Sequence, residues 1–134
     1  MDEKFIKLTK DLTLNSRASK DLIEMIERKL DVDLPKDYVS FMMESNGAEG
    51  FVGEAYLMLW PVDEVPEHNE GYHVAEFAPG LLLIGSNGAN EAYGFDLIED
   101  HMPIVNVPFI GMSTEERVKI ADTFIGFLEY LSTS

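Results

Sequence analysis

Leu81-Leu82-Leu83-Ile84-Gly85-Ser86-Asn87-Gly88 is a short apolar run that ends in turn-forming residues. Four consecutive large aliphatic residues before a Gly- and Asn-rich turn are typical of a buried β-strand. The next segment, Glu91 to Phe95, alternates polar and apolar residues, which predicts another strand. Because strands joined by so short a connection pair antiparallel, the whole stretch predicts an antiparallel meander.

Two further segments predict strands on either side of this stretch. Ala55 to Trp60 is short, aromatic and apolar and stops at Pro61, so a mostly buried strand is favoured over a helix. Ile104 to Val107 is bounded by prolines on both sides and predicts a fourth strand. Residues 66–80 predict a loop.

Helical patterns lie at both ends of the chain. The first has an apolar stripe behind Ser16 or Ser19, either of which suits an N-cap, and the stripe is Leu22, Ile23, Ile26 and Leu30. A second helix is expected from Pro35 to Asn46-Gly47, with its apolar stripe at Tyr38, Phe41 and Met42. The capping box Ser113-Thr114-Glu115-Glu116 predicts the start of a closing helix, whose apolar face is Val118, Ala121, Phe124, Ile125, Leu128 and Leu131.

Length and composition indicate one folded domain over residues 1–134. With 46% hydrophobic residues, the 134-residue chain can bury one core, and it has no internal repeat or linker. The absence of cysteine excludes disulfides and thiolate zinc sites. The N-terminus does not resemble a signal peptide and no apolar run is long enough to span a membrane, so a soluble cytoplasmic protein is expected.

The negative charge is confined to the middle of the chain. Residues 1–36 carry eight acids and eight Lys or Arg, and residues 117–134 carry two of each. Residues 37–116 carry 15 acids and no Lys or Arg, which accounts for the net charge of −15. This charge either keeps the protein soluble or steers a basic protein partner toward it, and it disfavours nucleic acid and anionic membranes as partners.

Eight short pieces in a fixed order resemble the SUKH superfamily, the Smi/Knr cell-wall-regulator domain, over most of the chain. They are Leu34-Pro35-Lys36-Asp37-Tyr38 with Phe41, Asn46-Gly47, Leu59-Trp60-Pro61, Asn69 with Tyr72, Ile84-Gly85-Ser86-Asn87-Gly88, Glu91-Ala92-Tyr93-Gly94-Phe95-Asp96, Val107-Pro108, and Ala121 with Phe124 and Phe127-Leu128. The sequence departs from many relatives at Asn87-Gly88-Ala89-Asn90, where an acidic, Gly-rich stretch is common.

The resemblance implies an α+β domain with a curved antiparallel sheet of about four to six strands, flanked by N-terminal and C-terminal helices. It also implies a protein-binding module. Bacterial members are similar to immunity proteins that neutralise toxin domains, often nucleases, and fungal members regulate cell-wall synthesis. An immunity protein is therefore the expected function, and a regulatory adaptor without a toxin partner is the alternative. The oligomeric state is left open.

Catalytic, cofactor and metal sites are not predicted. The three histidines are His68, His73 and His101, and Gly85-Ser86-Asn87-Gly88 has neither the form of a nucleophile elbow nor that of a phosphate-binding loop. Glu64 with these histidines could in principle bind zinc or a harder cation. Such coincidences are expected in an acidic loop, so we predict no metal site and no enzyme activity.

The candidate partner-binding residues are acids and tyrosines from the acidic middle of the chain: Glu67, Glu70, Tyr72, Glu76, Glu91, Tyr93 and Asp96. For Glu91 and Asp96 a solvated rim that caps turns is an equal alternative. Trp60 is expected to anchor the core, with an interface position as the alternative. The residues that carry the fold signature are Pro35, Tyr38, Trp60, Gly85 and Gly88.

Overall fold

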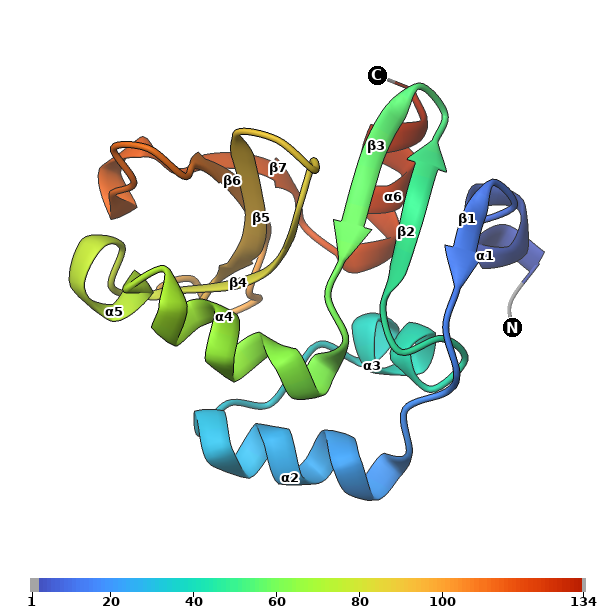
Figure 1. Ribbon diagram of the computed structural model, residues 1–134, viewed down its shortest axis with the longest axis horizontal. Coiled ribbons are helices and arrows are strands. Elements are labelled where there is room, and N and C mark those ends of the chain that lie inside the picture. The colour runs from blue at the N-terminus through green and yellow to red at the C-terminus, as the bar shows by residue number, and fades with distance from the viewer. Residues whose placement is uncertain (1–2, 134) are drawn as a thin grey trace.

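The computed structural model describes residues 3–133, which form an α+β fold around one open antiparallel sheet (Figure 1). The seven strands of this part of the chain are β1 (Leu12–Leu14), β2 (Ala48–Val52), β3 (Ala55–Leu59), β4 (Leu81–Ser86), β5 (Glu91–Asp96), β6 (Ile104–Pro108) and β7 (Val118–Ala121). Its helices are α1 (Glu3–Leu8), α2 (Lys20–Leu30), α3 (Lys36–Met42), α4 (Val65–Gly71), α5 (Val74–Phe77) and α6 (Phe124–Ser132), with single 3₁₀ turns η1 (Val62–Glu64) and η2 (Thr114–Glu116). The sheet thus has more strands than the four to six expected.

The sheet divides between β3 and β4. Each strand pairs antiparallel with the next along the chain, but β3 and β4 share only the pairs Met58↔Ser86 and Leu59↔Gly85. Strands β1 to β3 therefore form one limb and β4 to β7 another (Figure 1). A side chain at Gly85 would collide with the Met58 carbonyl oxygen on β3, so the crossing of the two limbs requires glycine there.

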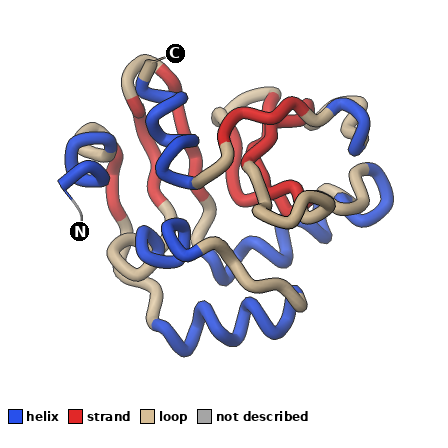
Figure 2. Tube along the Cα trace, turned by 180° about the vertical axis from the view of Figure 1, so that it is seen from behind, coloured by secondary structure: helices blue, strands red, loops and turns tan. Residues whose placement is uncertain are grey.

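Helices cover both faces of the sheet. Figure 1 shows α4 in front of β4, and Figure 2, seen from behind, shows α6 in front of the strands. The core under α6 is aromatic: the ring of Tyr38 makes edge contacts with Phe95 at 5.2 Å and with Phe124 at 5.3 Å. Burial raises the pKa of Tyr38 well above its ordinary value. Helices α3 and α6 are thus packed onto β5 through one cluster of rings.

The predicted strands β3, β4, β5 and β6 and the predicted helices α2 and α3 are confirmed, but α3 ends at Met42, earlier than the expected Asn46-Gly47. Ser19 is the N-cap of α2, where its side chain accepts a hydrogen bond from the Leu22 N–H, and Pro35 occupies the N-cap position of α3. Gly88 has a φ of +78° in the turn between β4 and β5, a conformation that favours glycine. None of the helices in the described part of the chain has the length and hydropathy to cross a bilayer.

The predicted start of the closing helix is wrong. Ser113 does cap a turn, accepting a hydrogen bond from the Glu116 N–H at 3.3 Å, but only the 3₁₀ turn η2 follows it. Val118 to Ala121 form β7, because the β-branched residues of this segment complete the sheet beside β6. The helix α6 begins at Phe124, where the side chain of Thr123 accepts from the Gly126 N–H.

The predicted loop at residues 66–80 is also wrong, since this segment contains α4 and α5. Pro66 lies in the first turn of α4, a position that tolerates proline because the N–H there has no partner within the helix. The apolar residues of α4 are too few for a visible helical stripe. Its stability comes from contacts with β4, which are described below.

Candidate partner-binding groove

The candidate site begins where β3 ends. Trp60 follows β3 directly, and its backbone N–H donates to the Ile84 carbonyl at 3.0 Å. The side chain is 7% exposed, and its indole stacks on the His68 imidazole with ring centres 4.2 Å apart. Trp60 therefore fits both interpretations. Its side chain is largely buried, as expected of a core anchor, and it also lines a groove, as expected of an interface residue.

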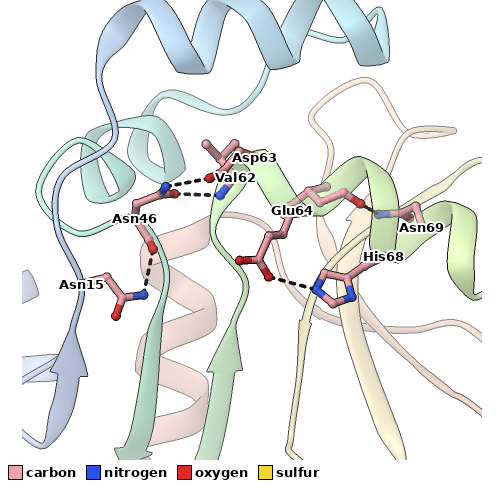
Figure 3. A network of polar contacts seen from close by, with 8 residues as sticks. Asn15, Asn46, Val62, Asp63, Glu64, His68 and Asn69 are labelled. Atoms are coloured by element: carbon pink, nitrogen blue, oxygen red, sulfur yellow. Dashed lines mark hydrogen bonds and ion pairs between the residues drawn. The ribbon is translucent and has the colours of Figure 1, made fainter.

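Helix α4 provides one wall of this groove. Residues four apart share a helix face, so Glu64 just before α4, His68 within it and Tyr72 just after it form one stripe. The ring of Tyr72 lies nearly parallel to that of Trp60, at 16° and 6.1 Å, and Tyr72 is 42% exposed. His68 Nε2 lies 3.4 Å from Glu64 Oε1 (Figure 3). The stripe is thus aromatic toward the groove and acidic at its start.

Asn69 fixes α4 to the sheet. Its Nδ2 donates to the carbonyls of Val65 and Leu83, each at 2.8 Å, and its Oδ1 accepts from the Leu83 N–H at 2.9 Å. Leu83 belongs to the part of β4 that β3 does not pair with. The Asn69 amide therefore makes the hydrogen bonds with Leu83 that a neighbouring strand would otherwise make. Asparagine suits this position because its side-chain amide can both donate and accept.

Asn46 fixes the turn that precedes α4. Its Oδ1 accepts from the Val62 N–H at 2.7 Å and its Nδ2 donates to Asp63 Oδ1 at 2.9 Å (Figure 3). The Asn46 carbonyl in turn accepts from Asn15 Nδ2 at 2.9 Å. These contacts tie the 3₁₀ turn η1 to the segments before β2, so the position of α4 is set at both ends.

The loop after β6 provides the opposite wall. The Phe109 ring lies 4.7 Å from that of Tyr72, and the Phe109 N–H donates to the Asn90 carbonyl at 3.0 Å. Ile110 is 91% exposed. The groove has a volume of about 730 Å³, and it is lined by Met58, Trp60, His68, Tyr72, Ser86, Gly88, Ala89, Asn90, Pro108, Phe109 and Ile110. It is an open, mainly apolar surface with aromatic rings on two sides.

The charge beside the groove is negative and uncompensated. Glu67 and Glu70 on α4 and Glu76 on α5 are exposed. Among the ion pairs formed within residues 3–133, none involves these three glutamates. No Lys or Arg occurs between residues 37 and 116 to neutralise them. A cationic partner would therefore meet an attractive field on this side of the molecule.

The structure separates the predicted partner-binding residues. Tyr72 lines the groove, and Glu67, Glu70 and Glu76 are exposed on the α4–α5 segment beside it. The other three, Glu91, Tyr93 and Asp96, lie on β5.

The β5 residues are tied into the fold. Asp96 is 3% exposed, and its Oδ2 accepts a hydrogen bond from Arg117 Nε at 2.7 Å. Tyr93 is 8% exposed and packs on Phe127 at 4.9 Å. Glu91 accepts from Asn106 Nδ2 at 3.3 Å. Asp96 and Tyr93 are therefore not on the open surface beside the groove, and the placement of Asp96 favours a structural role.

Sequence reasoning did not select Phe109 and Ile110. The signal was two large apolar residues in succession between Pro108 and Gly111, outside the predicted strands and helices. The histidines weighed as metal ligands are dispersed, with His68 next to Glu64 and His101 3.0 Å from Asp122. The described residues contain no group of three or more His, Asp or Glu side chains that could hold a metal ion. The absence of a metal site stays a prediction.

Another hollow, of about 530 Å³, lies at the opposite end of the sheet, beside α1 and the end of α6. Lys4, Lys7 and Lys10 reach it, and Lys4 is paired with Glu129 at 3.1 Å. Its charges are mixed and its lysines are exposed, whereas the groove combines stacked rings with a fixed framework. The groove is therefore the better candidate for a functional site.

Comparison of the sequence with known proteins gives a family match over most of the chain. The SMI1/KNR4 family (SUKH-1) model matches residues 17–130, which span α2 to α6. The uncharacterized protein YnaB of Bacillus subtilis (strain 168) is 41% identical over 68 residues, a match that covers 51% of this chain and 43% of that relative. The matched range contains Asn46, Trp60 and Asn69, the residues that build the groove and its framework. The chain belongs to the SMI1/KNR4 family (SUKH-1).

Proposed function

We propose that the protein is a non-enzymatic binding module, an immunity protein that neutralises a basic toxin domain by binding it at the groove. The observation that carries this proposal is the combination of an open apolar groove, 91% exposed at Ile110, with three exposed glutamates, Glu67, Glu70 and Glu76, that form no ion pair within residues 3–133. Exposed apolar surface bordered by polar residues is characteristic of protein interfaces.

The two features would act at different stages of binding. The acidic field accelerates the encounter with a basic protein, and nuclease domains are basic because they must hold phosphates. The side chains of Trp60, Tyr72 and Ile110 then set the lifetime of the complex, because buried aromatic and aliphatic contacts supply most of the binding free energy at such surfaces. A rim glutamate contributes little, about 0 to 1 kcal/mol each.

A co-expression experiment tests the proposal. A toxin domain found in a neighbouring gene, as the proposal expects, is expressed with wild-type protein, with Ile110→Asp, or with Ile6→Asp, and survival is scored. Ile6 is 55% exposed on α1, which lies beside β1 and away from α4 and β6 in Figure 1, so this variant adds the same charge at an exposed position that does not line the groove. Ile110 would become buried in the complex, so its loss should weaken binding by about 2 kcal/mol, roughly thirtyfold in Kd.

The expected result is survival with the wild type and with Ile6→Asp, and death with Ile110→Asp. Failure of the wild type to protect, together with no binding of the purified toxin domain, contradicts the immunity function. In that case the regulatory adaptor, which would use the same groove for a partner of the cell itself, becomes the better explanation. Equal protection by Ile110→Asp contradicts the groove as the binding site.

A further inference from the structure

A second pocket, of about 280 Å³, lies across the β4–β5 turn from the groove. It is bordered by the start of β3, by β5 and β6, and by the end of α6. Three of the residues that line it are tyrosines: Tyr56, Tyr93 and Tyr130. The hydroxyl of Tyr56 donates to Glu49 on β2, and the ring of Tyr93 packs on Phe127, so both of these rings are held in place.

A carboxylate with one unsatisfied oxygen lies beside these rings. Glu91 Oε1 accepts from Asn106 Nδ2 at 3.3 Å, whereas Oε2 is buried and has no hydrogen-bond partner in the described part of the chain. Glu91 and Tyr93 are two apart on β5 and share a face of the sheet, and Asn106, which lines the pocket, is the cross-strand partner of Tyr93. Glu91 does not line the pocket in the free protein, but buried polar atoms are normally hydrogen-bonded, so its Oε2 would gain a hydrogen bond from a donor inserted beside Tyr93.

The electrostatics of the pocket favour a positive charge. The pKa of Tyr93 is raised, first by burial and then by the nearby Tyr130 and Glu91. Burial disfavours a charge of either sign in the pocket, whereas the nearby carboxylate of Glu91 favours a cation over an anion. The faces of tyrosine rings also attract cations.

We propose that this pocket binds an arginine side chain of the partner protein. The inference rests on the proposed function, because it identifies the group by which a basic partner is recognised. A guanidinium is planar, stacks on tyrosine and presents several N–H donors, one of which can satisfy Glu91 Oε2. The ammonium of lysine is a compact, strongly hydrated charge and matches such a pocket less well.

The pocket and the groove can contact the same partner. Asn87 lines the pocket, and the next three residues of the turn, Gly88 to Asn90, line the groove. β3 likewise contributes Tyr56 to the pocket and Met58 to the groove. A partner surface that places an apolar side chain in the groove can therefore place an arginine in the pocket.

The test is an amide NMR titration of the whole protein with arginine blocked at both termini. Blocked citrulline, which has the same shape and no charge, and blocked lysine are titrated in parallel. Blocked arginine should cause saturable shifts at Asn87, Tyr93, Asn106 and Tyr130, with a Kd on the order of 1–10 mM for so small a ligand. Citrulline should cause none, and lysine should bind at least about fivefold more weakly.

Two variants locate the interaction. Glu91→Gln keeps an acceptor for Asn106 and removes the charge, and it should weaken arginine binding about tenfold or more. Glu24→Gln removes the same charge on α2, outside both the pocket and the groove, and should leave the affinity unchanged. If Glu91→Gln loses a dispersed spectrum, Tyr130→Leu at the exposed end of α6 replaces it, with the same loss of binding expected.

Equal binding of citrulline, stronger binding of lysine, unchanged affinity after both pocket substitutions, or shifts confined to the Trp60 groove would overturn the proposal. The titration contains no toxin domain, so its outcome is independent of the immunity function. If the protein binds the toxin domain but does not bind blocked arginine, only the arginine-binding role of the pocket is contradicted. Arginine binding without toxin binding contradicts the proposed function alone.

Discussion

The substitution Asn69→Ala tests the account of how the groove is positioned. It removes three hydrogen bonds, of 2.8, 2.8 and 2.9 Å, and leaves both backbone groups of Leu83 without the side-chain amide that pairs them. Leu83 is fully buried. An unpaired buried polar group costs about 1–3 kcal/mol, so the two groups together predict a loss of about 3 kcal/mol in the free energy of unfolding, with part of the cost relieved by water.

Thermal and urea unfolding measure this loss. Globular proteins unfold with an entropy of about 2.1 cal/mol/K per residue, so 3 kcal/mol corresponds to a fall of roughly 10 °C in the Tm of this chain. Asn69→Asp should be at least as damaging, because a carboxylate cannot donate to the Val65 and Leu83 carbonyls. Asn90→Ala, an exposed asparagine on the β4–β5 turn, is the matched control and should change stability by less than about 0.5 kcal/mol. A loss below about 1 kcal/mol in Asn69→Ala would refute the strand-replacing role of this amide.

Reversing the charge of the three exposed glutamates beside the groove should slow association with the toxin domain about tenfold at low salt, and high salt should remove the difference. An association rate that depends on neither the charge reversal nor the salt concentration excludes electrostatic steering. These residues are Glu67, Glu70 and Glu76. Asp96→Asn should instead destabilise the fold by about 2–3 kcal/mol through its pair with Arg117, and a urea midpoint equal to the wild type would show that the pair is dispensable. Trp60→Ala should cost about 3–5 kcal/mol in unfolding measurements because it empties a buried ring position, and a much smaller loss would contradict its core role. Hydrogen bonds from Lys119, and secondly from His101, lower the pKa of the Asp122 carboxyl. Its contribution to stability is therefore present above the ordinary pKa of 3.8 and is lost as the pH falls through the lowered value. A carbon NMR titration of Asp122 with a midpoint at or above 3.8 would contradict this.

The strands that could be predicted are those whose signal is local. β4 and β6 are apolar runs bounded by turn residues, and a buried strand of this kind is visible without any knowledge of its neighbours. β1 has only three residues, and β2 contains Gly50, so neither has a strong strand pattern of its own. These two strands form because they pair with each other and with β3.

The errors at η2 and α4 come from long-range contacts that outweigh local preference. The hydrogen bond of Ser113 is a genuine capping interaction, but the pairing of Val118 and Lys119 with β6 ends the helix after one turn. At α4 the opposite holds, since a segment rich in polar residues becomes a helix because Asn69 anchors it on Leu83. Neither contact has a signature within a short sequence window.

The candidate site could be predicted only in part. Trp60 and Tyr72 stand in the segments that resemble the family, and the structure places both on the groove. Phe109 and Ile110 lie in a loop without periodicity, so only the structure brings them to the same surface. For Asp96, sequence position could not distinguish an exposed acid from one buried against Arg117 at 2.7 Å.

Hydrogen–deuterium exchange of the protein with and without a toxin domain that it binds locates the partner-binding surface. If the partner binds in the groove, exchange should become slower on binding at α4 and at Phe109 and Ile110, which line the groove. Exchange at α1 and α2, outside the groove, should stay unchanged. Protection confined to α1, α2 or the free edge of β7, with α4 and residues 108–110 unaffected, would contradict the groove as the site of partner binding.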